Sequence, residues 1–128
     1  MYSSPLQAYE TVNKKTMSGR EIEATILNQA ARKLKDCQNN WDADDREERL
    51  TAALEYNQQI WSILQSELVR ADHPLPAQIR RNLLSLSVFV DRRIFESMAF
   101  PSPEKLTIII DINRNIAAGL MESTAAGG

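Results

Sequence analysis

The sequence predicts an all-α fold, an antiparallel bundle of four main helices preceded by a short N-terminal helix. Through most of the chain the apolar side chains recur with a period of about 3.6 residues, the period of an α-helix. No segment shows the alternating pattern of a strand, and only four of the 128 residues are glycines. The helical period breaks at residues 18–19, 39–40, 73–76 and 101–103. We expect one domain over residues 1–122 and a disordered tail over residues 123–128.

The first half of the chain contains three of the expected helices, of which the short one covers residues 5–15. Ser18 followed by Glu21 matches a capping box and predicts the start of a helix over residues 19–38. Asp42 or Asp44 is expected to cap the next helix, which ends near residue 69. The apolar residues that should face the core from the two long helices are Ile22, Ile26, Leu27, Ala30, Leu34, Leu50, Ala53, Leu54, Ile60, Trp61, Leu64 and Leu68.

Prolines mark the starts of the last two helices. Pro76 suits the first turn of a helix over residues 76–98, because that position needs no backbone N–H. Pro103 opens the last helix by the same rule, and Gly119 is expected near its end. Because the corner at residues 101–103 is short, the two helices should pack as antiparallel neighbours.

These last two helices carry more apolar residues than one buried face requires, since such a face occupies only about 100° of a helix. Two explanations remain open. The fourth helix could be surrounded in a five-helix core, or part of its surface could form a groove for a partner's amphipathic helix. In the second case the extra residues should form a partly exposed patch. The candidate partner-binding residues are Leu84, Val88, Phe89, Ile108 and Ile112.

Two asparagines, Asn57 and Asn113, fall on the apolar faces of their helices. A buried amide needs hydrogen bonds, and one polar residue in a packed seam can fix the register of the helices. We therefore expect both to have a structural role, with a contact to a partner's backbone as the alternative. On this reading Asn57→Leu should leave the protein folded, and at least as stable, while loosening helix register.

The sequence contains no recognisable catalytic or metal-binding pattern. His73, the only histidine, has no partner at a metal-ligand spacing and is expected to be an ordinary loop residue. Cys37, the only cysteine, is expected to be a half-buried structural thiol. The acidic residues between positions 42 and 48 lack the alternating ligands of a calcium loop and suit helix capping. We therefore expect no enzyme, no cofactor and no metal.

Composition limits the partners and the compartment. A net charge of −2 and a pI near 5.4 disfavour direct binding to nucleic acid, where neutralised phosphates supply much of the affinity. A single cysteine cannot form an internal disulfide, which favours a reducing compartment. The sequence shows neither the apolar core of a signal peptide nor a run of about 18 apolar residues. We expect a cytoplasmic protein that does not enter a membrane.

Several stretches of the chain form an ordered series: Ala8-Tyr9, Trp61-x-x-Leu64, Leu75-Pro76-x-x-Ile79-Arg80, Leu83-Leu84-Ser85-Leu86 and Ile110-Asp111-Ile112-Asn113-Arg114-x-Ile116-x-x-Gly119-Leu120. This series resembles the FlaF family of flagellar biosynthesis regulators over nearly the whole chain. Phe89 stands where the family often has tryptophan, and Gln78 where an acidic residue is common; both changes are conservative for packing.

The resemblance implies a small, non-enzymatic cytoplasmic protein that promotes flagellin production and works opposite FlbT, a regulator that represses flagellin mRNA. Flagellin is the expected partner, because its terminal segments are amphipathic helices that would self-assemble if left uncovered. The protein would then promote flagellin synthesis and secretion as an export chaperone, with FlbT as a second candidate partner. The alternatives are a post-transcriptional regulator acting on flagellin mRNA directly or through FlbT, and a structural homodimer without a groove.

Overall fold

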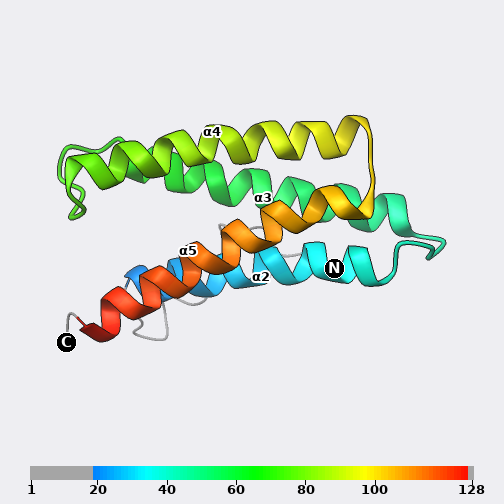
Figure 1. Cartoon of the computed structure of the whole chain (residues 1–128), viewed down its shortest axis with the longest axis horizontal. Helices are drawn as coiled ribbons and strands as arrows, with labels where there is room; N and C mark the ends of the chain where they lie inside the picture. Colours follow the sequence, from blue (N-terminus) through cyan, green and yellow to red (C-terminus); the bar gives the residue numbers. More distant parts are fainter. Residues whose placement is uncertain (1–18, 127–128) are drawn as a thin grey trace.

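A computed structural model describes residues 19–126 of the chain, and the backbone over this range is helical without any strand (Figure 1). The predicted all-α class is therefore confirmed for this part of the chain. The predicted helix over residues 5–15 and the capping residue Ser18 lie outside the described residues. The elements, in chain order, are α2 (Gly19–Asn39), α3 (Arg46–Leu68), α4 (Ala77–Ala99), the short 3-10 helix η1 (Pro103–Lys105) and α5 (Leu106–Ala126).

The helices do not all contact one another equally. α2 makes the most extensive contact with α5 and also packs on α3, while α4 packs mainly on α3. Figure 1 shows α3 and α4 side by side, with α5 crossing α2 below them. α4 and α5 share little contact and separate from the corner that joins them. The prediction that they pack as close neighbours is wrong, because α5 packs along α2 instead.

The core lies between α2, α3 and α5. Every buried residue of α2 is apolar, and the predicted apolar faces of α2 and α3 are buried as expected. α5 closes the core with an apolar stripe at helical spacing that includes Leu106, Ile109, Ile110 and Ala117. α4 adds only Val90 and Ile94 to this buried apolar set. The described residues therefore do not surround the fourth helix.

Some helix ends differ from the predictions. Asp45, rather than Asp42 or Asp44, precedes the first residue of α3, and its side chain makes no capping hydrogen bond. The Asp45 carboxylate instead accepts a hydrogen bond of 2.7 Å from Arg49 Nε one turn later. α5 runs through Gly119 to Ala126, so the helix continues into the segment predicted as a disordered tail. A glycine inside a helix weakens it by about 1 kcal/mol relative to alanine but does not end it.

None of the described helices is both long and apolar enough to cross a membrane.

Candidate functional site

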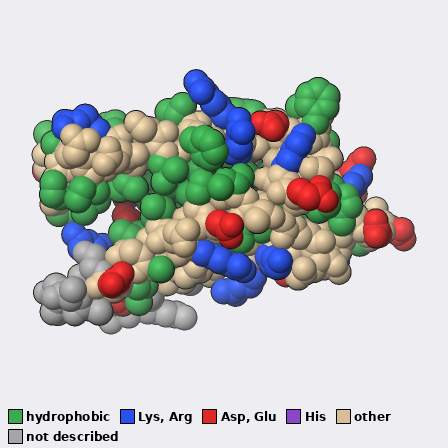
Figure 2. Space-filling view, in the orientation of Figure 1, with side chains coloured by type: hydrophobic (Ala, Val, Ile, Leu, Met, Phe, Trp, Pro, Cys, Tyr) green, Lys and Arg blue, Asp and Glu red, His purple; other side chains and the backbone are tan. Residues whose placement is uncertain are grey.

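The outer surface of α4 is unusually apolar for a helix in contact with water. α4 buries two apolar and two polar residues, while several of its large apolar side chains are exposed. In Figure 2 hydrophobic side chains follow α4 and gather between α4 and α5. The exposed large apolar residues of α4 are Ile79, Val88, Phe89, Phe95 and Met98, followed by Phe100 just after its end.

The predicted partner-binding residues are exposed to different degrees. Val88 is 49% exposed, Phe89 40% and Ile108 42%, whereas Leu84 and Ile112 are half-buried. Three of the five side chains are therefore open to solvent in the part of the chain that the structure describes. Their role in partner binding stays a prediction.

The predicted residues of α4 lie on two flanks of the helix. Residues three or four apart on a helix are neighbours, and residues two apart are not. Phe89 is therefore a neighbour of Leu86, which packs against the core as Ile112 of α5 also does. Leu84 and Val88 are neighbours of each other but lie on the flank away from Leu86. The extra residues of α4 thus form two separate surfaces rather than one patch.

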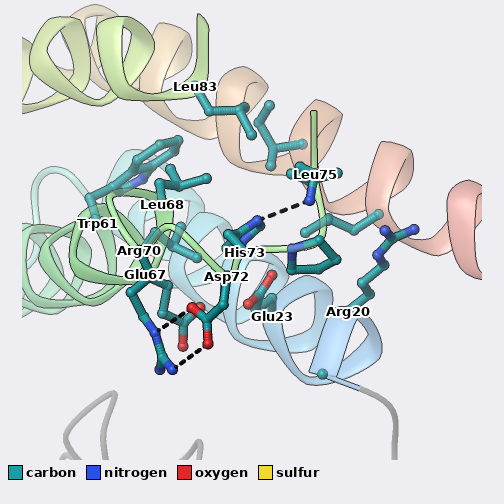
Figure 3. Close-up of a pocket in the computed structure, with 15 residues that line it drawn as sticks. Arg20, Glu23, Trp61, Glu67, Leu68, Arg70, Asp72, His73, Leu75 and Leu83 are labelled. Atoms are coloured by element: carbon teal, nitrogen blue, oxygen red, sulfur yellow. Dashed lines mark hydrogen bonds and ion pairs between the residues drawn. The ribbon is translucent and has the colours of Figure 1, made fainter. Parts of the chain in front are cut away.

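A cavity of about 330 Å³ lies at the end of the molecule where α4 and α5 are apart. The segment between α3 and α4 forms one side of it, and the first turns of α2 form another. Figure 3 shows Leu68, Leu75 and Leu83 around this space. Trp61, Leu64, Ile116 and Leu120 complete its apolar lining. Such a hollow with mainly apolar walls and a few polar groups is typical of binding sites.

Trp61 is held in the wall of the cavity by a chain of buried hydrogen bonds. Its indole Nε1 donates to Asn113 Oδ1 at 2.9 Å, and Asn113 Nδ2 donates to Asn57 Oδ1 at 2.6 Å. Asn57 Nδ2 in turn donates to the backbone oxygens of Ala53 and Ala30. This network joins α2, α3 and α5. The predicted burial and structural role of the two asparagines is confirmed, since both are fully buried.

Charged side chains surround the mouth of the cavity. Glu23 of α2 and Glu67 of α3 share a hydrogen bond between their carboxyl groups, which requires a proton on one of them. Burial is the main cause that raises the pKa of Glu23 to about 8, followed by the hydrogen bond and the charge of Glu67, while Arg20 acts in the opposite direction. Arg70 pairs with Asp72 through two hydrogen bonds near 3 Å (Figure 3).

His73 lines the cavity, and its ring shapes the loop between α3 and α4. The backbone N–H of Leu75 donates to His73 Nδ1 at 3.2 Å (Figure 3). His73 therefore lies in the loop between α3 and α4, as the sequence predicted.

Cys37 is a core residue rather than a reactive one. Its side chain is buried in the main core cluster. Burial, and to a smaller extent the charge of Asp36, raises the pKa of the thiol. Over residues 19–126, no three His, Cys, Asp or Glu side chains come together in a group that could hold a metal ion.

Sequence reasoning missed the cavity. Leu83, Ile116 and Leu120 match the helical spacing of buried faces, and nothing in that spacing tells a cavity wall from a packed core. Glu23 and Glu67 are far apart in the sequence, so their pairing depends on how α2 and α3 pack. The sequence contained one signal for each glutamate. Glu23 directly follows the core residue Ile22, and Glu67 directly precedes the core residue Leu68, so both lie at the edge of a buried face.

Comparison with known proteins places the chain in a family. A family model described as flagellar protein FlaF matches residues 5–120, which is most of the chain. No curated protein and no solved structure matches it. The matched range includes both the apolar surface of α4 and all the residues that line the cavity. The chain therefore belongs to the FlaF family of flagellar proteins.

Proposed function

We propose that this protein promotes flagellin synthesis and secretion by binding flagellin in the cytoplasm before export, as an export chaperone. The observation that carries the proposal is the apolar outer surface of α4. Membership of a flagellar family supports a role in making the flagellum, and exposed apolar side chains support contact with another protein. An apolar stripe on a helix is also what the amphipathic helix of a partner would pack against.

Two surfaces of α4 are open to such a partner. Val88 and Phe95 lie two turns apart on one flank, and Phe89 lies on the other. The ring of Phe89 is also covered on one side by the guanidinium of Arg93, 5.1 Å from its centre. A partner helix that lies along the outside of α4 could contact both flanks. Burying each exposed ring or branched side chain would contribute about 1–3 kcal/mol.

The charge of the chain favours a protein partner over RNA. The net charge is −2, and Arg49, Arg70 and Arg93 are each paired with a carboxylate. Binding to mRNA would need a positively charged surface to neutralise phosphates. Binding through α4 would instead be mostly apolar, only weakly sensitive to salt, and accompanied by a negative heat-capacity change.

Calorimetric titration of the full-length protein with purified flagellin tests the proposal. We expect Val88→Glu and Phe89→Glu to weaken flagellin binding by at least tenfold, because a charge would then face the apolar surface of the partner. Asn28→Glu is the control, because Asn28 is an exposed polar residue of α2, a helix that does not pack extensively on α4, and its substitution should leave binding unchanged. Circular dichroism should show all three variants folded.

The outcomes separate the proposal from its rivals. Failure of the wild-type protein to bind flagellin would overturn it. Salt-dependent binding to flagellin mRNA, or binding to FlbT alone, would favour regulation at the level of the message. Self-association that is lost in Val88→Glu would show that α4 is covered by a second copy of the chain instead.

A further inference from the structure

The cavity lies where the chain enters the described part of the structure. Gly19, the first described residue, is one of the residues that line it. Eighteen residues precede Gly19 in the sequence. An extended chain spans about 3.3 Å per residue, so any of residues 5–15 can reach the cavity from its attachment at Gly19. Attachment beside the site also gives the segment a high effective concentration there, in the millimolar range for a short linker.

The walls of the cavity call for an apolar ligand, and charged groups of both signs stand at its mouth. The walls carry leucine, isoleucine and tryptophan side chains, and Leu75, Leu83, Ile116 and Leu120 are only half-buried. At the mouth, three carboxyl groups (Glu23, Glu67 and Asp72) stand with two guanidinium groups (Arg20 and Arg70). One guanidinium, that of Arg70, is already paired with Asp72. The other two carboxyl groups, those of Glu23 and Glu67, share one proton, and the charge of Arg20 acts on them. An added positive charge would stabilise their ionised form.

The N-terminal segment has this chemistry. Leu6, Tyr9 and Val12 recur every third residue, followed by Lys14 and Lys15. The first 18 residues contain two lysines and one glutamate, which gives them a side-chain charge of +1. Because the whole chain has a net charge of −2, the other 110 residues have a net charge of −3. The segment therefore carries apolar side chains at helical spacing and a net positive charge, while the rest of the chain is acidic in total.

We propose that residues 5–15 of the same chain occupy the cavity, with Leu6, Tyr9 and Val12 against its apolar walls and the two lysines near the carboxyl groups at its mouth. The cavity is then a site for the chain's own N-terminal segment. A flagellin helix bound along α4 would use a different surface, so the two sites can be tested separately. A partner that needed the cavity would have to displace the segment first.

Disulfide trapping in the full-length protein tests the position of the segment. Tyr9→Cys is combined with Leu83→Cys, which lines the cavity, or with Ser85→Cys as the control. Ser85 is exposed and, two residues further along α4, points to the opposite side of the helix. Cys37 is buried and should not compete. We expect the Leu83→Cys pair to form an intramolecular disulfide at least tenfold faster than the Ser85→Cys pair, and denaturant to remove the difference.

Equal rates for the two pairs would overturn the proposal, and so would disulfide-linked dimers, which would place the segment of one copy in the cavity of another. A second measurement avoids any effect of the new disulfide on folding. Leu6→Asp with Tyr9→Asp should accelerate the labelling of Leu83→Cys by a thiol reagent and leave the labelling of Ser85→Cys unchanged. If only added flagellin protects Leu83→Cys, the cavity belongs to the partner and the proposal is wrong.

Discussion

α2 and α4 are helices of nearly equal length, with 21 and 23 residues, but they use their apolar residues in opposite ways. α2 buries eight residues, all apolar, between α3 and α5. α4 buries four, of which Ser87 and Ser97 are polar, and it exposes larger apolar side chains than it buries. The difference shows that apolar content alone does not make a helix part of the core. A core helix also needs other helices packed against it on more than one side, as α2 has and α4 does not.

The hydrogen bonds of the two helices differ in the same sense. Ala30 of α2 accepts a bond from the buried network of Asn57 and Asn113, in which each buried amide has a partner. In α4, Ser87 and Asp91 accept hydrogen bonds from the side-chain amide of Gln65 in α3. The hydroxyl of Ser97 is buried with no hydrogen-bond partner among residues 19–126. α2 is therefore fixed by a satisfied polar network, and α4 by a looser contact to one neighbour.

The largest difference should appear when an apolar side chain is removed from each helix. We expect Leu27→Ala in α2 to lower the free energy of unfolding by about 2–5 kcal/mol, since Leu27 is fully buried. Phe95→Ala in α4 should change it by about 0.5 kcal/mol or less, because Phe95 is 55% exposed. Urea unfolding followed by circular dichroism measures both. Comparable losses that depend on protein concentration would show that a second copy covers α4.

The second prediction compares the polar links of the two helices. Asn57→Leu should lower the free energy of unfolding by about 1–3 kcal/mol, because Asn113 Nδ2 and the Ala30 oxygen lose their buried partner. This replaces the expectation from sequence of unchanged or higher stability, which assumed that a satisfied amide in the seam contributes to helix register more than to free energy. Gln65→Leu, which removes the half-buried link to α4, should have a clearly smaller effect in the same denaturant experiment.

The third prediction concerns the end of α2 that borders the cavity. The pKa of Glu23 is about 8, against 4.5 in its ordinary state, so between these values the folded protein holds a proton that the unfolded chain has released. The contribution of this group is fully present below pH 4.5 and is lost as the pH rises toward 8. We expect Glu23→Gln to flatten the fall in unfolding free energy between pH 5 and pH 8.

Denaturant unfolding at both pH values measures this effect, with Glu55→Gln on the exposed side of α3 as the control. An equal decline in Glu23→Gln and in the wild-type protein would show that Glu23 titrates in its ordinary range. In that case the first turns of α2 would be more open to water than its middle.

The last prediction concerns a small gain in stability on the exposed side of α5. Gly119 is inside the helix, and a Cβ added there would meet no atom within 4 Å. Gly119→Ala should therefore raise the free energy of unfolding by about 0.5–1 kcal/mol, because alanine loses less backbone entropy in a helix. Thermal unfolding by circular dichroism should show a higher midpoint. A lower midpoint would mean that another surface lies against this glycine in solution.

The local part of the fold could be predicted from the sequence, because it depends on short-range patterns. The helical period predicted α2 within one residue at its C-terminal end, and the fully buried faces around Ile26, Leu54 and Trp61. The partners of each helix could not be predicted in the same way. The spacing of Leu83 and Ile116 is the same whether they meet a packed core or the wall of a cavity.

The site was predicted only where exposure follows from an excess of apolar residues on one helix, as for Val88 and Phe89. Which of the two flanks of α4 faces α5 depends on the direction of α4 relative to α5, which the Pro101-Ser102-Pro103 corner leaves undecided. The pairing of Glu23 with Glu67 depends on the register between α2 and α3. These long-range relations are set by tertiary packing, and single-helix periodicity carries no information on them.

The close packing of α2 on α5 has a consequence for the time course of folding. These are the first and last helices of the described chain, and Gln38 Nε2 bonds the Pro103 oxygen across 65 residues. Contacts of such long sequence separation slow folding, because a large loop must close before they form. On the ribosome, α2 must wait with one apolar side uncovered until residues 106–117 have been synthesised. Chaperones that act on nascent chains should therefore bind α2 more often than α4.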